Sequence, residues 1–132
     1  MTEYVVDASA LIAALSRKDT VGTAVRKIFN NSRTHAPALI DAEVGQVLRR
    51  LERRGEINSE VAQAGLYAVE HFIDERYEHG PFLRAAWRLR HTITFYDGLY
   101  VTLAAALDLP LLTSDEKLTN APGLSCAIQL LR

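Results

Sequence analysis

Tyr4-Val5-Val6-Asp7, near the start of the chain, is a β-branched and aromatic run that ends at an acid. Leu111-Leu112-Thr113 is a second apolar run, and it ends at Ser114-Asp115. Short runs of this kind predict buried strands. Because helical patterns lie between the two runs, the sequence predicts an α/β fold with a mainly parallel sheet. In such sheets ligands bind beyond the carboxyl ends of the strands, which is where Asp7 and Asp115 lie.

The rest of the chain supplies the helices and shorter strands that this fold needs. Apolar residues at helical spacing predict helices over 20–31, 41–54, 58–72, 81–89 and 97–107, after a first helix capped by Ser9. Short strands are expected within 34–38, 75–79 and 127–131. Helices that alternate with buried strands are typical of an α/β sandwich, in which a central sheet is flanked by helices.

Size and composition bound the class of protein. With 132 residues, 48% of them apolar and 23% charged, the chain is expected to form one globular domain over 1–132. The formal net charge is −1, so any contact with nucleic acid must come from a local basic patch. The single cysteine, Cys126, excludes a disulfide framework. Without a signal-peptide pattern or an apolar run of bilayer length, we expect a cytoplasmic protein with no membrane contact.

Four acids lie where chemistry is expected in such a fold. Asp7 and Asp115 follow the two buried strands, whereas Glu43 and Asp97 lie near helix starts beside apolar faces. Each acid alone is more often a turn residue or a helix cap. Their joint placement favours a function, because clustered carboxylates repel one another and are costly to desolvate without a counter-charge. Oxygen ligands of this kind suit Mg²⁺, with Mn²⁺ as a possible substitute.

Four sequence motifs carry a family resemblance. Residues 5–11 (VVDASAL), 38–44 (ALIDAEV), 95–101 (FYDGLYV) and 111–118 (LLTSDEKL) occur in this order and span nearly the whole chain. They resemble the acidic motifs of PIN domains, particularly those of the VapC toxins of bacteria and archaea. Gly98 is a departure, since alanine is expected there, but it removes no acid. Residues 56–95 carry no motif.

The resemblance implies a fold, an activity and partners. The fold would be a PIN-like three-layer sandwich, and the activity the Mg²⁺-dependent endonucleolytic cleavage of RNA by a toxin of a type II toxin–antitoxin pair. Asp7, Asp97 and Asp115 would hold the metal, directly or through water, and Glu43 would complete the acidic pocket. Ser9, Thr113 and Ser114 would orient a water or a carboxylate. A cognate antitoxin and a second copy of the chain, in a homodimer, are the expected protein partners.

Two runs of basic residues are either solvent-exposed helix faces or surfaces that bind RNA phosphates. Arg49, Arg50, Arg53 and Arg54 follow Glu43, and they form either a solvated helix face or a phosphate track that leads to the acids. Arg84, Arg88, Arg90 and His91 form a second possible track, interleaved with Trp87. Because Trp87 lies at helical spacing from Leu83, it is expected in the core rather than on a base-stacking surface.

Other functions fit the residues less well. A PIN-like module that binds RNA or protein without catalysis would gain nothing from four mutually repelling acids. A phosphorelay receiver needs adjacent acids near the first strand, and a phosphatase of the haloacid dehalogenase type needs an acid at Ser9. The four histidines show no zinc-ligand spacing. Ser9 lacks the glycines of a serine hydrolase elbow, and no Gly-rich phosphate loop is present.

Overall fold

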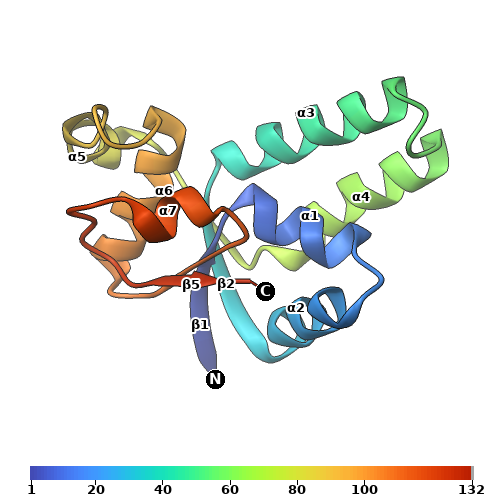
Figure 1. Ribbon diagram of the computed structural model, residues 1–132, viewed down its shortest axis with the longest axis horizontal. Coiled ribbons are helices and arrows are strands. Elements are labelled where there is room, and N and C mark those ends of the chain that lie inside the picture. The colour runs from blue at the N-terminus through green and yellow to red at the C-terminus, as the bar shows by residue number, and fades with distance from the viewer. Residues whose placement is uncertain (132) are drawn as a thin grey trace.

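The computed structural model of the chain describes residues 1–131, in which a five-stranded sheet is covered by helices (Figure 1). In chain order the elements are β1 (Thr2–Val6), α1 (Ala8–Ser16), α2 (Thr20–Asn31), β2 (Ser32–Pro37), α3 (Leu39–Arg53), α4 (Ser59–Phe72), β3 (Glu75–Tyr77), the 3₁₀ turn η1 (Gly80–Phe82), α5 (Leu83–Arg88), α6 (Phe95–Leu107), β4 (Leu111–Thr113), α7 (Glu116–Asn120) and β5 (Ile128–Leu130). Within residues 1–131, no helix is long and apolar enough to cross a membrane.

The sheet places the ends of β1 and β4 side by side. The strand order is β3-β2-β1-β4-β5, and every neighbouring pair is parallel, which confirms the expected parallel sheet. From β1 the chain first builds outward through β2 and β3, and then it crosses to the other side of β1 to form β4. The order therefore reverses between β1 and β4, and such a switch point leaves a crevice at the carboxyl ends of the two strands.

Helices cover both faces of the sheet and make it the middle layer. Figure 1 shows α5, α6 and α7 on one side of β1 and α1 to α4 on the other. On the first side α6 packs against β1, β2 and β4, and on the second α1 packs against β4 and α2 against β2. The expected three-layer α/β sandwich is thus confirmed.

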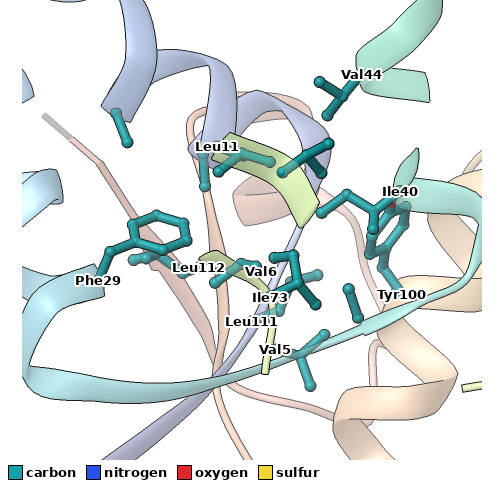
Figure 2. Close-up of a cluster of buried hydrophobic side chains, with 14 of the residues drawn as sticks. Val5, Val6, Leu11, Phe29, Ile40, Val44, Ile73, Tyr100, Leu111 and Leu112 are labelled. Atoms are coloured by element: carbon teal, nitrogen blue, oxygen red, sulfur yellow. The ribbon is translucent and has the colours of Figure 1, made fainter. Parts of the chain in front are cut away.

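The core lies between these layers. Val5, Val6, Leu111 and Leu112 of the two central strands are fully buried, as their apolar runs predict. Figure 2 shows Phe29 and Tyr100 reaching this cluster from opposite sides. Full burial of an aliphatic side chain of this size contributes about 1.5–3 kcal/mol. The strands that carry Asp7 and Asp115 are therefore firmly anchored.

Helix caps explain the differences from the expected bounds at α1, α6 and α7, whereas α3 begins two residues earlier than expected, at Leu39, without a side-chain cap. The first helix begins at Ala8 and its N-cap is Asp7, whose carboxylate accepts from the amide of Ala10; the expected cap, Ser9, lies inside the helix. The Asp97 helix begins two residues earlier, because Thr94 caps it. The short helix α7 was not predicted, and its cap is Asp115.

The expected burial of Trp87 is wrong. Trp87 is 57% exposed and Leu83 is 45% exposed, although their helical spacing is typical of a core face. Helix α5 is only six residues long, and Ala86 is its one fully buried residue. Ala86 packs against Gly98 of α6. Helix α5 therefore contacts α6 through a small side chain, and its larger apolar side chains remain exposed at the surface.

Candidate active site

Asp7 lies at the end of β1 in the crevice beside β4. Its side chain is buried, and three donors hold it in place: the hydroxyl of Ser9 at 2.6 Å and the amide of Ala10 at 2.9 Å bond to Oδ1, and the hydroxyl of Thr113 bonds to Oδ2 at 2.5 Å. Burial raises the pKa of Asp7 most, the nearby charge of Asp115 adds to this, and the three donors oppose it. The carboxylate is thus fixed in orientation and costly to ionise.

The two hydroxyls tie the β4 loop to the start of α1. Thr113 Oγ1 accepts from the amide of Asp115 at 3.0 Å, and Ser9 Oγ accepts from the amide of Ser114 at 3.0 Å. Because each hydroxyl has a single proton, which it donates to Asp7, these amides find acceptors without competing for Asp7 itself. Ser9 and Thr113 therefore orient the Asp7 carboxylate, whereas Ser114 takes part through its backbone amide.

Asp97 and Asp115 approach the same crevice from two helix starts. Asp97 is in the first turn of α6, half-buried, and Asp115 caps α7 by accepting from the amide of Lys117 at 2.9 Å. Burial raises the pKa of Asp97, and the charges of Asp115 and Asp7 raise it further. The Thr94 hydroxyl and the Lys117 ammonium partly oppose this rise in the pKa.

Glu43 lies in the second turn of α3, on the other side of the sheet from α6, and its carboxylate is close enough to interact with the charges of Asp97 and Asp7. The buried hydroxyl of Tyr100 donates to Glu43 Oε1 at 2.6 Å, which lowers the pKa of Glu43. Burial outweighs this contact, and the charges of Asp97 and Asp7 add to burial, so the pKa of Glu43 is raised overall. The same environment raises the pKa of Tyr100, so its hydroxyl stays protonated and remains a donor.

The donor set fits a hard divalent cation by its chemistry. Four carboxylates gather with no cation within ion-pair distance of any of them among residues 1–131. In the same part of the chain, no three acidic or other ligating side chains converge into a ready-made metal cage. Mg²⁺ usually keeps several waters and binds through one or two carboxylates, so it does not require three ligating side chains that already converge. Among residues 1–131, Asp7 Oδ2 accepts a single hydrogen bond, so it has an acceptor position left.

Comparison with known proteins agrees with this geometry. The family model described as PIN domain matches residues 4–124. The chain belongs to the PIN-domain family. Over 133 residues, which cover 100% of both chains, it is 50% identical to the ribonuclease VapC1 of Mycobacterium tuberculosis.

Solved structures of similar fold include a Pyrobaculum aerophilum protein, PAE2754. Its TM-score is 0.72 at 26% identity, over 96% of this chain and 89% of that one. The VapBC2 structure from Rickettsia felis, bound to a DNA fragment from its promoter, also gives a TM-score of 0.72, at 13% identity over 99% and 100% of the two chains. The second likeness is one of fold alone.

The arginines after Glu43 divide between two grooves on α3 of this PIN domain. Arg50 lines a groove together with Glu43, Ala8 and Tyr96, so it lies beside the acidic cluster. Arg49 and Arg53 line a second groove farther along α3, which Arg50 also borders. All of these arginines are exposed, and none forms an ion pair within residues 1–131.

Three residues of this PIN-domain site escaped the sequence analysis. Tyr100 lies three residues after Asp97, on the same face of a helix, and that spacing is a usable signal for a supporting donor. Thr94 has the form of a helix cap three residues before Asp97. Lys117 lines the same groove as Asp97, but nothing in the local sequence predicts that the two lie near each other.

Proposed function

We propose that this chain is a metal-dependent endoribonuclease and the toxin of a type II toxin–antitoxin pair. The observation that carries the proposal is the gathering of Asp7, Glu43, Asp97 and Asp115 at the switch point between β1 and β4. Full-length similarity to a protein named a ribonuclease supports the same chemistry. The substrate is RNA, the cofactor is Mg²⁺ or Mn²⁺, and the protein acts in the cytoplasm.

The residues divide the work of phosphodiester hydrolysis. Asp7, Asp97 and Asp115 would hold the cation, directly or through water, and Glu43 would complete the pocket. Ser9 and Thr113 keep the Asp7 carboxylate facing the crevice. A bound divalent cation supplies positive charge for the phosphate and lowers the pKa of a water. A water in the pocket would be the attacking group, so the ribose 2′-hydroxyl would not be required as a nucleophile.

A cleavage assay tests the activity. RNA should be cut with Mg²⁺ or Mn²⁺ and left intact in EDTA, and Asp7→Asn and Asp97→Asn should each lower the rate by orders of magnitude. Melting curves give an independent readout, because added Mg²⁺ should stabilise the parent but not Asp7→Asn. Exposed Asp108→Asn, at the other end of α6, is the matched control. If an Asp97→Asn protein cut RNA fully in EDTA, this mechanism would be excluded. The cleavage would then come from a contaminating nuclease or from another site.

The antitoxin is expected in an apolar groove between three helices. The groove is lined by Ile12 and Leu15 of α1, Val47 and Leu51 of α3 and Val61 of α4, among others. Val47 also lines the groove that contains Glu43, so a helix bound in the first groove has a direct path to the acids. An antitoxin arginine on that path would replace the charge of the metal and inhibit the enzyme.

Co-purification with the product of an adjacent gene tests this partner. Val61→Glu should abolish the complex, because it places a charge in the apolar groove, and it should leave RNA cleavage unchanged. Leu66→Glu is the matched control, since Leu66 is 49% exposed on the same helix, Val61 is 50% exposed, and Leu66 does not line the groove. Equal binding by both variants would contradict the groove. Sedimentation of the purified chain tests the expected homodimer.

A further inference from the structure

An aromatic shelf is exposed next to the acidic crevice. It consists of Leu83 and Trp87 of α5 and Phe95 of α6, which line one shallow hollow with Arg84 and Arg88. Trp87 is the only tryptophan of the chain and is 57% exposed. The edge of one ring meets the face of the other between Trp87 and Phe95, with ring centroids 6.4 Å apart and planes at 65°. The indole is thus held in place and its surface is open to solvent.

Cations surround the aromatic shelf. The Arg90 guanidinium lies 4.7 Å from the centre of the Trp87 ring and donates to the Trp87 carbonyl at 3.0 Å. No Asp or Glu occurs between Glu78 and Asp97 in the sequence. Within residues 1–131, the arginines of this segment form no ion pairs. The surface therefore combines an exposed aromatic ring, with Arg90 over one of its faces, and unneutralised positive charge, which complements a polyanion that carries aromatic bases.

A groove connects the shelf with the acids. Its lining includes Arg90, His91 and Thr94, together with Asp97 and Lys117. Arg90 thus contacts Trp87 of the shelf and also lines this groove, and Asp97 belongs both to the groove and to the acidic cluster. A nucleic-acid strand that crosses Asp97 can therefore reach Trp87 without leaving a basic surface.

We propose that Trp87 stacks against an unpaired base of the RNA substrate, while Arg90 and Lys117 bind the phosphates between that base and the acidic cluster. This inference rests on the proposed ribonuclease function and adds the place where the strand is held. Bases inside a duplex are already stacked on their neighbours, so the site favours single-stranded or looped RNA, whose bases are free to stack on the indole. A second copy of the chain fits less well, because a two-fold contact would gather the unneutralised arginines of both copies in one interface.

The fluorescence of Trp87 tests the proposal, because no other tryptophan contributes to the signal. In EDTA, a single-stranded RNA oligonucleotide should quench the fluorescence and saturate, whereas a blunt duplex of the same sequence should not. Binding of a labelled strand, followed by anisotropy, should weaken about tenfold in Trp87→Ala and stay near parental in Trp87→Phe, which keeps a stacking ring. Tyr67→Ala is the control, since Tyr67 is 65% exposed on α4.

The outcomes separate this inference from the proposed function. If RNA is cleaved, yet Trp87→Ala binds and cleaves it like the parent, the stacking site is wrong and the ribonuclease stands. Quenching that depends on protein concentration without RNA, together with a dimer that Trp87→Ala dissociates, would make the shelf an interface between copies and would also overturn the proposal. If the parent neither cleaves nor binds any RNA, both the function and the stacking site fail.

Discussion

Asp7 both caps helix α1 and belongs to the acidic cluster of the candidate active site. Its Oδ1 caps α1 through Ala10 and accepts from Ser9, and its Oδ2 accepts from Thr113. Asp19 caps α2 in the same way, but it is exposed and paired with Arg17, which lowers its pKa. Burial instead raises the pKa of Asp7. The two caps therefore contribute to stability with opposite dependence on pH.

The pH dependence of stability follows from the raised pKa values of Asp7, Glu43 and Asp97. Each carboxyl binds its proton more tightly in the folded protein than in the unfolded chain, where its pKa is about 4. In EDTA the protein should therefore lose stability as the pH rises from about 4 through these raised values, and lose no more above them. Asp7→Asn should flatten this profile and be as stable as the parent, or more so, near neutral pH.

Denaturant melts at several pH values measure this effect. Asp19→Asn is the control: because the pKa of Asp19 is lowered, its stabilising contribution is present at neutral pH and is lost as the pH falls through the lowered value. If Asp7→Asn were clearly less stable than the metal-free parent at neutral pH, the capping role of Asp7 would outweigh the cost of burying its charge.

Tyr100 acts on Glu43 through one hydrogen bond, which can be removed without changing the shape of the core. Tyr100→Phe should raise the pKa of Glu43, because the lost bond is one that lowers it. If cleavage needs ionised Glu43, the acidic limb of the kcat/KM profile should shift to higher pH, and the rate near neutral pH should fall up to about tenfold. Tyr67→Phe should change neither. An unshifted limb in Tyr100→Phe would leave Tyr100 with a packing role only.

At the scale of elements, the contact between α5 and α6 depends on one glycine. A Cβ at Gly98 would lie 3.0 Å from the Ala86 carbonyl oxygen and 3.3 Å from its Cα. Both of those atoms are backbone, so neither can swing away as a flexible side chain would. The glycine that departs from the expected motif thus permits α5 to lie close to the start of α6, where Asp97 is placed.

The stability of two glycine variants tests this close approach. Alanine is a better helix former than glycine by about 1 kcal/mol. In α3, where no atom lies within 4 Å of the new Cβ, Gly45→Ala should gain most of that amount. Gly98→Ala should instead lose about 1 kcal/mol, because overpacking costs about 1–3 kcal/mol and exceeds the gain in propensity. Urea denaturation compares the two, and an equal gain in both would show that α5 shifts freely.

For the whole molecule, the formal net charge of −1 hides a strong separation of charge. The acids gather in one crevice, and exposed arginines flank it on α3 and on α5. A protein of this kind can attract RNA without being basic overall, because the local field near the crevice decides which ions gather there. The two flanks give an RNA strand two possible directions of approach.

The salt dependence of RNA binding tests the α3 flank. If Arg50 contacts a phosphate, Arg50→Ala should weaken binding and reduce the slope of log K against log salt by about 1. Lys27→Ala, which removes the same charge from the exposed face of α2, should leave the slope unchanged. If Arg50→Ala also leaves it unchanged, this arginine run is a solvated helix face.

The sequence by itself determined the central strands, most helices and the positions of the four acids. These features are local: a buried strand shows as a short apolar run, a helix as a spacing of three to four residues, and a strand end as the residue after the run. Asp7 and Asp115 could be placed at one sheet edge because parallel strands end on the same side.

Only the tertiary structure decided the contacts between distant segments. The hydroxyl of Thr113 reaches Asp7 across β1 and β4, and that of Tyr100 reaches Glu43 from α6 to α3. Trp87 is exposed because Ala86 takes the buried position against Gly98, although the periodicity of α5 alone predicts a core residue. These hydrogen bonds and exposures depend on which surfaces pack together. A local pattern of residues does not specify which distant segment will lie against it.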